Sequence, residues 1–559
     1  MLSKLCFVSV AFCTLVLFAS CNKTNKEGKY IPKNAAIAVH VNGAAFSSKL
    51  PWEEVKQNEM FKKLYADSSI PAFVKQAMDN PDNSGIDTKN DLIFFAQKDS
   101  TGGVIVFTGK IKDAEKFKLF SLDVTKGGSE SERDGVNYIS KSPVCVGWNK
   151  EKFVYLVDAP QMNMQNAWKN DSNSVYTPKP RDMGAACKNI FDLQENNSLA
   201  ENEKFTALMK KSGDIHFWMN GEELNKGGAA NPALAMLNMN KLYEGSITAA
   251  TVNFENGKIV LEAKSYAGKE LTGLYKKYGG KNFDETMIKR LPVKELAAVF
   301  AMSFKPEGIK ELLKVLGVDG LANMGLAQLG INLDEFIKAN KGDILIAVTS
   351  LQQKNLTDSS AAVTNNSFIQ PDVIFSTSIA DKDAFNLLIK AGEKIGNNIP
   401  ANFPLAYNTD GKYFAIGNTK ENIDKYITGG SNNSFDFLSK INNNPFGGYV
   451  NLQYILKAFE TSFSKDSAAK VVYEASLKMW DNIYIKGGNF EDGGMVQSGE
   501  INLMDKSTNS LKQLNQYIGL LSKIKIEQDK KIRVTDINME EIYKDKMPVP
   551  PPPPVKKRN

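Results

Sequence analysis

The sequence predicts an α+β protein made of two tandem copies of a mostly antiparallel β-sheet with packed helices. Segments of alternating apolar and polar residues are followed by stretches of helical period. Asn-Gly and Asp-Gly dipeptides stand between alternating segments, which is typical of tight β-hairpins. The same succession of elements occurs twice along the chain, which indicates an internal duplication.

The first copy is predicted over residues 31–280 and the second over 291–525, with a boundary near Lys281 to Arg290. The corresponding segments lie at residues 37–42 and 298–302 (strand), 52–78 and 309–316 (helix), 91–95 and 343–347 (strand), 104–107 and 373–375 (strand), and 215–220 and 449–451 (strand ending in Asn). The third strands lead to Asp113 and Asp381, which we expect to cap the helices that follow.

The most specific correspondence is that of the last hairpins. Residues 253–257 (Asn-Phe-Glu-Asn-Gly) match residues 489–493 (Asn-Phe-Glu-Asp-Gly), and a helical pattern follows each. We expect these hairpins at equivalent places, with positive φ at both central residues of each turn.

The first twenty residues predict a signal peptide. Lys4 gives a positive start, and residues 7–18 form an apolar run too short for a permanent membrane helix. Small residues then precede Cys21, a pattern that resembles the lipobox of bacterial lipoproteins. The resemblance implies cleavage before Cys21 and its acylation, which would anchor the chain in a membrane. A plain secretory peptide with Cys21 as a bystander is the alternative.

The ends of the mature chain are predicted to be extended. Residues 21–30 are polar and are interpreted as a tether, and residues 547–559 form a proline-rich, basic tail. By resemblance to known sorting signals, Asn22 after Cys21 implies the outer membrane, with the periplasmic and surface faces both open. The net charge of +6 is small for 559 residues, so no nucleic-acid partner is expected.

The whole layout resembles the uncharacterised tandem-duplicated lipoproteins of Bacteroidetes-type cell envelopes, a family catalogued as a domain of unknown function. The resemblance covers nearly the entire mature chain and implies no particular activity. No functional residues can be carried over from that family.

Candidate chemistry is limited by the presence of only two histidines, His40 and His216. A histidine zinc site or a Ser-His-Asp triad would have to use one of them. Both lie on alternating strands, and by local matching their counterparts in the second copy are Phe300 and Gly447. We therefore expect core or surface imidazoles, with no catalytic residue, no metal and no cofactor.

Two further patterns leave alternatives open. Asn80, Asp82, Ser84, Gly85 and Asp91 fall on calcium-loop positions, but an Asx-type turn explains them as well. The thiols of Cys145 and Cys187 could form a disulfide or remain buried and free.

The sequence thus favours a non-enzymatic binding or scaffolding module of the cell envelope. Its expected partners are a membrane, through lipidated Cys21, and an unidentified envelope protein or glycan. The alternative is a glycan-handling protein or hydrolase that uses a carboxylate pair. A cleft lined by two carboxylates and a tryptophan would favour the alternative, and a convex surface without a cleft would favour the module.

Overall fold

The computed structural model describes residues 28–99, 102–159, 181–226, 238–355, 367–396, 405–430, 432–463 and 466–546. The predicted signal peptide, Cys21, most of the tether and the proline-rich tail lie outside these residues. Within them the chain is an α+β protein with one antiparallel sheet of eighteen strands, which confirms the predicted fold class. Among the described helices, none combines the length and apolar character that a membrane crossing requires.

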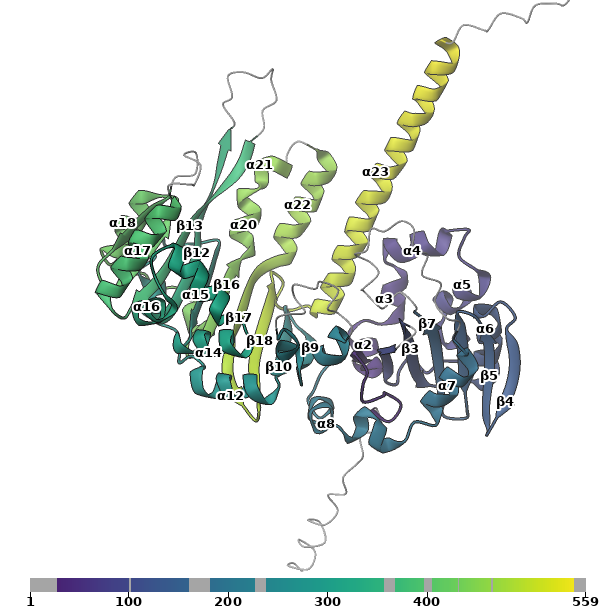
Figure 1. Cartoon of the computed structure of the whole chain (residues 1–559). Helices are drawn as coiled ribbons and strands as arrows, with labels where there is room; N and C mark the ends of the chain where they lie inside the picture. The colour runs from purple at the N-terminus through teal and green to yellow at the C-terminus, as the bar shows by residue number, and fades with distance from the viewer. Residues whose placement is uncertain are drawn as a thin grey trace, which may run out of the picture.

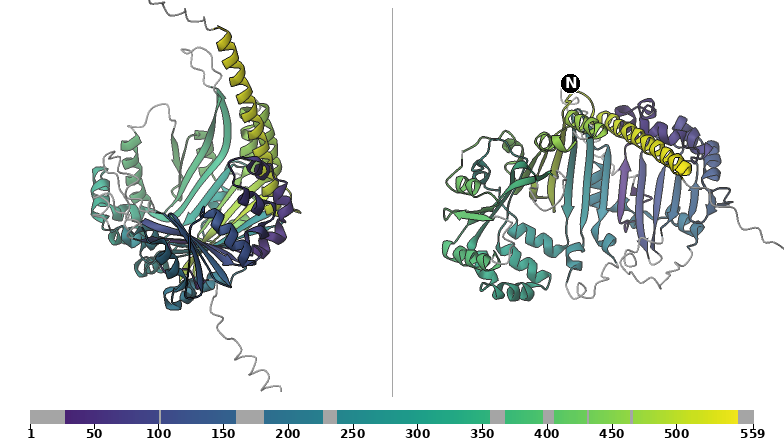
Figure 2. Two further views of the ribbon diagram at one scale, coloured as in Figure 1. Left: turned by 90° about the vertical axis from the view of Figure 1, so that its right-hand side faces the viewer. Right: turned by 90° about the horizontal axis from the view of Figure 1, so that it is seen from above.

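The sheet runs without interruption through both halves of the chain (Figure 2). From its outer edge inward, the first half contributes β4 (Ser129–Arg133), β5 (Val136–Lys141), β6 (Val144–Trp148), β7 (Lys152–Asp158), β3 (Gly102–Lys110), β2 (Leu92–Asp99), β1 (Ile37–Val41), β8 (Ile215–Asn220), β9 (Ile247–Glu255) and β10 (Lys258–Tyr266). The second half continues with β18 (Gly494–Leu503), β17 (Trp480–Glu491), β16 (Phe446–Asn451), β11 (Ala298–Ser303), β12 (Asn340–Asn355), β13 (Ser367–Ile379), β15 (Tyr413–Gly417) and β14 (Ala406–Thr409).

The two halves have the same strand order on either side of the β10–β18 pair. Moving outward from this pair, the first half has the order β10, β9, β8, β1, β2, β3. The second half has the order β18, β17, β16, β11, β12, β13. In each half the last hairpin comes first, followed by the strand that ends in Asn220 or Asn451 and then by the first three strands of that half. The first half adds β4 and β5 at its edge. Tandem copies require such an order, and the duplication itself stays a prediction.

Helices follow the strands at corresponding places. After β1 come α2 (Gly43–Lys49), α3 (Trp52–Lys56), α4 (Glu59–Ala66) and α5 (Ala72–Asp79), and after β11 come α14 (Glu307–Val315), α15 (Asp319–Gln328) and α16 (Leu333–Ala339). The helical stretch predicted over residues 52–78 is therefore broken into three. The Asn58 side chain caps α4, and Pro71 starts α5, so each of these residues begins a new helix.

The remaining α-helices lie between later strands or after the last one. They are α6 (Ala114–Val124), α7 (Met183–Phe191), α8 (Glu203–Met209), α9 (Gly221–Asn225), α11 (Asn240–Tyr243), α12 (Lys269–Tyr278), α13 (Glu285–Lys289), α17 (Lys382–Gly396), α18 (Lys420–Ile427), α19 (Leu438–Ile441), α20 (Leu452–Ala458), α21 (Glu460–Phe463), α22 (Ser467–Met479) and α23 (Ser510–Lys546). The predicted caps are confirmed: Asp113 Oδ1 accepts from Lys116 N at 3.1 Å, and Asp381 Oδ1 accepts from Ala384 N at 2.9 Å.

The two predicted hairpin turns differ in their backbone. Asp492 and Gly493 both have positive φ, 42° and 80°, as expected. In the first half only Gly257 does, at 68°, so the expectation was wrong for Asn256. Asn256 instead bridges to Asn509, and Gly257 N donates to Thr508 O, so the chain before α23 holds this turn.

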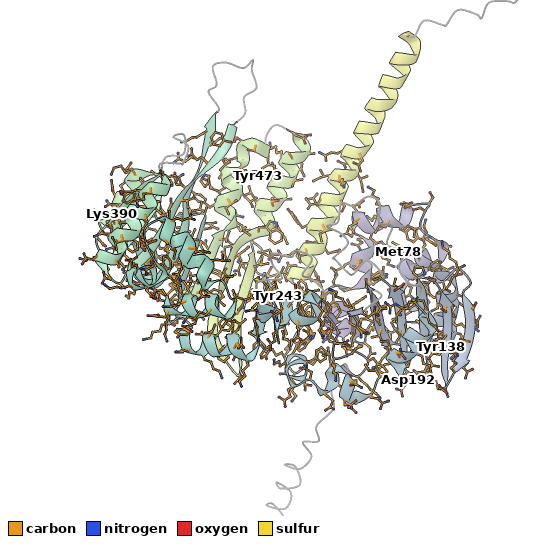
Figure 3. The ribbon with its side chains drawn as sticks, viewed as in Figure 1. Met78, Tyr138, Asp192, Tyr243, Lys390 and Tyr473 are labelled. Atoms are coloured by element: carbon orange, nitrogen blue, oxygen red, sulfur yellow. The ribbon has the colours of Figure 1, made fainter. Side chains whose placement is uncertain are left out.

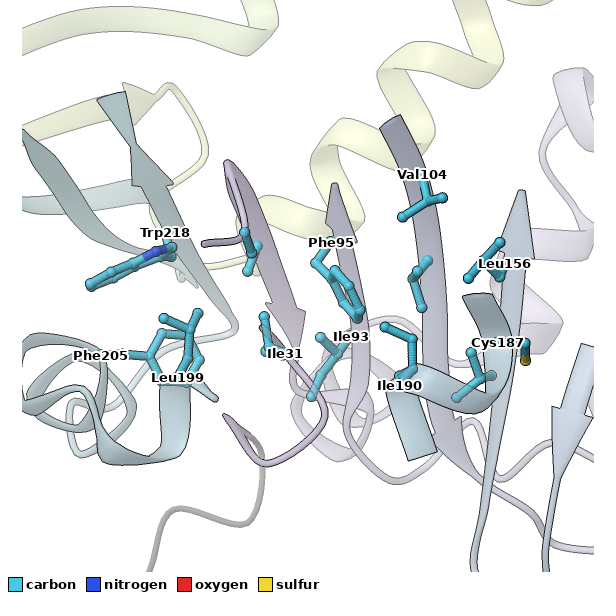
Figure 4. Close-up of a cluster of buried hydrophobic side chains, with 14 of the residues drawn as sticks. Ile31, Ile93, Phe95, Val104, Leu156, Cys187, Ile190, Leu199, Phe205 and Trp218 are labelled. Atoms are coloured by element: carbon cyan, nitrogen blue, oxygen red, sulfur yellow. The ribbon is translucent and has the colours of Figure 1, made fainter. Parts of the chain in front are cut away.

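Each half has its own apolar core. In the first, Trp218 is 1% exposed and meets Phe205 edge to face, with Ile31, Phe95 and Leu199 nearby (Figure 4). A separate cluster around Phe283, Leu345 and Tyr426 fills the second half. Burying one such side chain stabilises the fold by about 1.5–3 kcal/mol.

The last helix of each half packs against the other half. α12 of the first half lies against α14 of the second, and α23 of the second half lies against α4 of the first (Figure 1). The α23 contact is polar: Asn58 Nδ2 donates to Asn515 O at 2.7 Å, and Lys512 Nζ donates to Glu54 Oε1 at 2.6 Å. The halves are thus joined by the sheet and by two reciprocal helix contacts.

Candidate functional site

An apolar cavity of about 330 Å³ lies where α12 meets α14. Both halves contribute to its wall, which consists of Leu242, Leu271, Leu274, Tyr275, Tyr278, Gly279, Gly280, Met302, Ser303, Phe304, Lys305, Gly308, Ile309, Leu312, Pro445, Phe446, Gly488, Phe490 and Met495. Tyr243, next to the lining residue Leu242, marks this middle region in Figure 3. Among the described residues, this wall contains no acidic side chain, no histidine and no tryptophan.

Local sequence explains how this wall forms. On α12, Leu271, Leu274 and Tyr278 recur at helical spacing and so lie on one face. Gly308 lets α14 approach that face, because a Cβ there would lie 2.7 Å from Tyr278 Cβ. Phe490, on the last hairpin, adds an aromatic ring from the sheet. The cavity therefore depends on a close helix contact between the halves.

One lysine lines this cavity, and another lies beside an aromatic ring of its wall. Lys305 belongs to the wall, and its Nζ donates to the carbonyl oxygen of Lys277 at 2.8 Å. Lys276 Nζ lies 5.4 Å from the centre of the Phe490 ring. The nearby Glu311 is neutralised by Lys314, 2.8 Å away. An apolar interior beside lysine ammonium groups suits a ligand with an apolar chain and an anionic group.

A second, wider cleft of about 930 Å³ lies among α2, α3, α5 and the chain before β2. Trp52, Glu53, Asp79 and Asp82 all line it. The structure thus contains a cleft with a tryptophan and at least two carboxylates, the arrangement expected of a glycan-handling protein. Trp52 is 36% exposed, so part of its ring is free to contact a ligand.

The polar groups of this cleft already have partners within the protein. Trp52 Nε1 donates to the carbonyl oxygen of Met78, in the last turn of α5 (Figure 3), at 3.0 Å. Glu53 pairs with Lys56 at 2.8 Å, and the hydroxyl of Tyr65 donates to Asp79 at 3.1 Å. None of these carboxylates is isolated in an apolar setting, as the general acid of a glycosidase is.

The calcium-loop residues do not converge on one point. Asn80 Oδ1 accepts from Asp82 N at 3.0 Å, which confirms the Asx-type turn, and the Asp82 carboxylate pairs with Lys112. Asp91 instead contacts His40. Over the described residues, no three His, Cys, Asp or Glu side chains are grouped so as to hold a metal ion.

The two histidines, 176 residues apart in sequence, are direct cross-strand partners on β1 and β8. Their Nδ1 atoms are 3.0 Å apart, and His216 Nε2 lies 2.9 Å from the carbonyl oxygen of Lys211. His40 Nε2 lies 3.0 Å from Asp91 Oδ1, an ion-pair distance, although its N–H direction misses that oxygen. Both rings are buried, at 6% and 5% exposure.

The histidines line a third cavity, of about 470 Å³, together with Lys49, Lys211 and Asp214. Interaction with His40 lowers the pKa of Asp91, and burial lowers the pKa of His216 from its usual value of 6.5. Three of the four ring nitrogens make hydrogen bonds within the protein, and the fourth, His40 Nε2, lies only at ion-pair distance from Asp91.

The strand register corrects the predicted counterpart of His40. Met219 and Val450 each precede the Asn that ends their strand, and they pair with Ile37 and Ala298. Ile37 and Ala298 are therefore equivalent positions in the two halves. His40 lies three residues after Ile37, so its counterpart is Ala301, three residues after Ala298, and not Phe300. The ungapped match failed because the two first strands differ by one residue in their offset from the flanking motifs. The predicted counterpart of His216, Gly447, agrees with the register.

Cys145 on β6 and Cys187 on α7 are both fully buried and are free thiols in the structure. A hydrogen bond between them lowers the pKa of Cys145, while that contact and burial raise the pKa of Cys187. Their placement in one core joins α7 to the sheet and offers no access to a substrate.

Comparison with solved structures finds two crystal forms of TP0453. Form IV is 9% identical, covers 42% of this chain and 80% of its own, and has a TM-score of 0.24. Form I is 10% identical, covers 43% and 79%, and has a TM-score of 0.23. No curated protein matches the chain. A family model described as "Domain of unknown function (DUF4836)" matches residues 30–370, more than half of the chain, and the chain belongs to this family.

Proposed function

We propose that this protein is a cell-envelope lipoprotein, anchored through Cys21, that binds an amphipathic ligand in the cavity between α12 and α14. The apolar chain of the ligand occupies the cavity, and its anionic head group lies beside the lysines at the opening. The observation that carries the proposal is a wall of apolar side chains with Lys305 and no acidic residue. Its volume falls at the lower end of the range for small-molecule sites.

A fatty acid is the simplest ligand of this chemistry. Burial of each CH₂ group contributes about 0.8 kcal/mol, so a chain that fills the cavity supplies affinity without any polar contact inside. The head group then selects among amphiphiles, because a carboxylate gains from Lys305 where a neutral ester does not. The described part of the wall offers no acid–base pair and no nucleophile aligned with a base, which favours binding over turnover.

Displacement of a fluorescent polyene fatty acid by palmitate from the mature chain tests this proposal. Leu312→Trp should fill the cavity and weaken palmitate binding at least tenfold. Leu321→Trp, on α15 and 58% exposed, is the matched control and should bind as the unmodified chain does. Equal affinities for the two variants, or no binding by the unmodified chain, would contradict the proposal.

Recognition of the anionic head group is tested separately. Palmitate should bind more tightly than its methyl ester, and Lys305→Gln should remove most of that difference. An ester that binds as well as the acid would leave the apolar cavity in place but reject the anionic head group.

The anchor is tested separately. Cys21→Ala should release the protein from membranes or leave it unprocessed, because the acylated thiol and amino group would be lost. Detergent phase partitioning measures this, and unchanged membrane association of the variant would reject the lipoprotein assignment.

A second candidate, glycan binding, is favoured by the cleft that Trp52 lines together with three carboxylates. An exposed indole stacks on the apolar face of a sugar ring, and carboxylates accept hydrogen bonds from its hydroxyls. Calorimetric titration with a chito-oligosaccharide would measure this. Trp52→Ala should abolish the binding, whereas Leu312→Trp should not change it.

A further inference from the structure

The hydrogen-bonded rings of His40 and His216 impose a proton count. The carbonyl oxygen of Lys211 can only accept, so His216 Nε2 carries a proton. The contact between the two Nδ1 atoms needs one proton between them. The Asp91 carboxylate is negative, so its ion pair with His40 Nε2 needs a proton there too. Three protons on four nitrogens are one more than two neutral rings hold.

The charges around the pair are consistent with this count. Asp91, before β2, faces the His40 side of the pair, with Lys110 of β3 behind it. On the His216 side, Asp214 is paired with Lys49 of α2 and accepts from Phe254 N at 2.6 Å. Lys211 turns its side chain towards Glu262 of β10, 3.4 Å away. The carboxylate in contact with the rings is Asp91, on the His40 side of the pair, and burial lowers the pKa of His216 and so favours its neutral form.

We propose that His40 and His216 form one proton-binding site, which holds a single shared proton in the folded protein and acts as an acid-sensitive latch. Uptake of a second proton places an N–H on both facing Nδ1 atoms, so their hydrogen bond is lost and two cations face each other with ring centres 5.0 Å apart. His216 then moves towards the adjoining polar cavity, since the sheet blocks the other direction.

This movement would release the segment from Lys211 to Asp214. That segment is held by the contact of His216 with the Lys211 carbonyl and by tight packing at Gly213, where a Cβ would lie 3.0 Å from His216 Nε2. Asp214 in turn links it to α2 and β9 through Lys49 and Phe254 N. The latch therefore joins the β1–β8 pair to the loop that precedes β8.

The sign of the pH effect follows from the neutral ring. In the folded state the pKa of His216 lies below 6.5, so the unfolded chain takes up its proton at a higher pH than the folded chain does. The contribution of His216 to stability is complete above that pH and is lost as the pH falls through the lower, folded-state pKa. Over the pH range in which the unfolded chain binds one more proton than the folded chain, the equilibrium constant of unfolding rises up to roughly tenfold for each unit by which the pH falls.

Long-range ¹H–¹⁵N spectra of the histidine-labelled chain, recorded from pH 8 to 4.5, test the proposal directly. Because the chain has two histidines, His216→Gln assigns both sets of signals. At pH 7 we expect three protonated nitrogens and one bare Nδ1, and in acid four protonated nitrogens together with shifts of the 211–214 amides. Two bare nitrogens at pH 7, or two independent titrations, would overturn the shared proton.

Denaturant unfolding between pH 7 and 5 adds a second measurement. His216→Gln should remove the loss of stability on acidification that arises from the lowered pKa of His216. A variant with the full pH dependence would overturn the latch. If the variant does not fold, the spectra of the unmodified chain alone decide the question.

Discussion

The two halves of the sheet share their strand order and differ in chemistry at two equivalent places. The first place is the contact that the last helix of each half makes with the other half. Where α12 meets α14, apolar side chains leave a cavity, whereas α23 meets α3 and α4 through hydrogen bonds from Asn58 and Lys512. Both contacts join the halves, but only the contact of α12 with α14 leaves an apolar cavity beside it.

The second place is one pair of residues that face each other across neighbouring strands, β1 and β8 in the first half and β11 and β16 in the second. The first half has His40 and His216 beside a polar cavity, and the second half has Ala301 and Gly447. Phe283 and Ile441 occupy the space above Gly447. The same backbone register thus supports a polar site in one half and a dry core in the other. Side-chain volume, and not strand order, decides which of the two forms.

The largest effect should come from placing a histidine in the second half at the position that corresponds to His216. In Gly447→His, the new Cβ would lie 2.8 Å from both Ile441 O and Phe283 Cε1, and the buried imidazole would lack a partner. We expect a loss of about 3 kcal/mol or more in the free energy of unfolding, or failure to fold. Urea unfolding measures it, and a loss below about 1 kcal/mol would show that the two places are interchangeable.

A smaller effect is expected at the polar helix contact. Asn58→Ala removes the donor to Asn515 O and also the cap of α4, where Asn58 Oδ1 accepts from Met60 N at 2.9 Å. The expected cost is about 1–2 kcal/mol, with palmitate affinity unchanged. Thermal unfolding and the displacement assay measure the two quantities. A weakened affinity would show that the two helix contacts are coupled and not independent.

The smallest effect should be that of Asp91→Asn. The pKa of Asp91 is lowered by His40, so this pair stabilises the fold above the ordinary carboxylate pKa and loses its effect as the pH falls through the depressed value. Because the Asp91 side chain is 44% exposed, solvent screening limits the cost at pH 7 to under about 1 kcal/mol. The difference should shrink as the pH falls below 3.8, and a difference that stays constant down to the acid limit of folding would exclude the ion pair as its cause.

Local patterns in the sequence sufficed for much of the fold. The alternating strands, the caps Asp113 and Asp381 and the turn at Asp492-Gly493 depend on neighbouring residues, and all three are found. Asn256 departed from its pattern because a distant segment, around Asn509, holds the turn. Local preference is overridden where tertiary contacts supply more stabilisation.

The candidate sites could not be predicted because they depend on register and on contacts between the halves. The pairing of His40 with His216 requires β1 to lie next to β8 with one register out of several, over a separation of 176 residues. The apolar cavity needs α12 to cross from one half to the other, which no periodicity indicates. The apolar face of α12 was visible in the sequence as Leu271, Leu274 and Tyr278, but its partner was not.

Hydrogen–deuterium exchange of the mature chain, with and without saturating palmitate, tests the central claim most directly. Ligand at about 100 times its Kd stabilises the bound form by roughly 2.7 kcal/mol, so local opening at the site should slow at least tenfold. We predict slower exchange in α12 and α14, with no change in α3, α4 or the first turns of α23. Protection that is absent, or that appears equally at both helix contacts, would contradict a ligand site between α12 and α14.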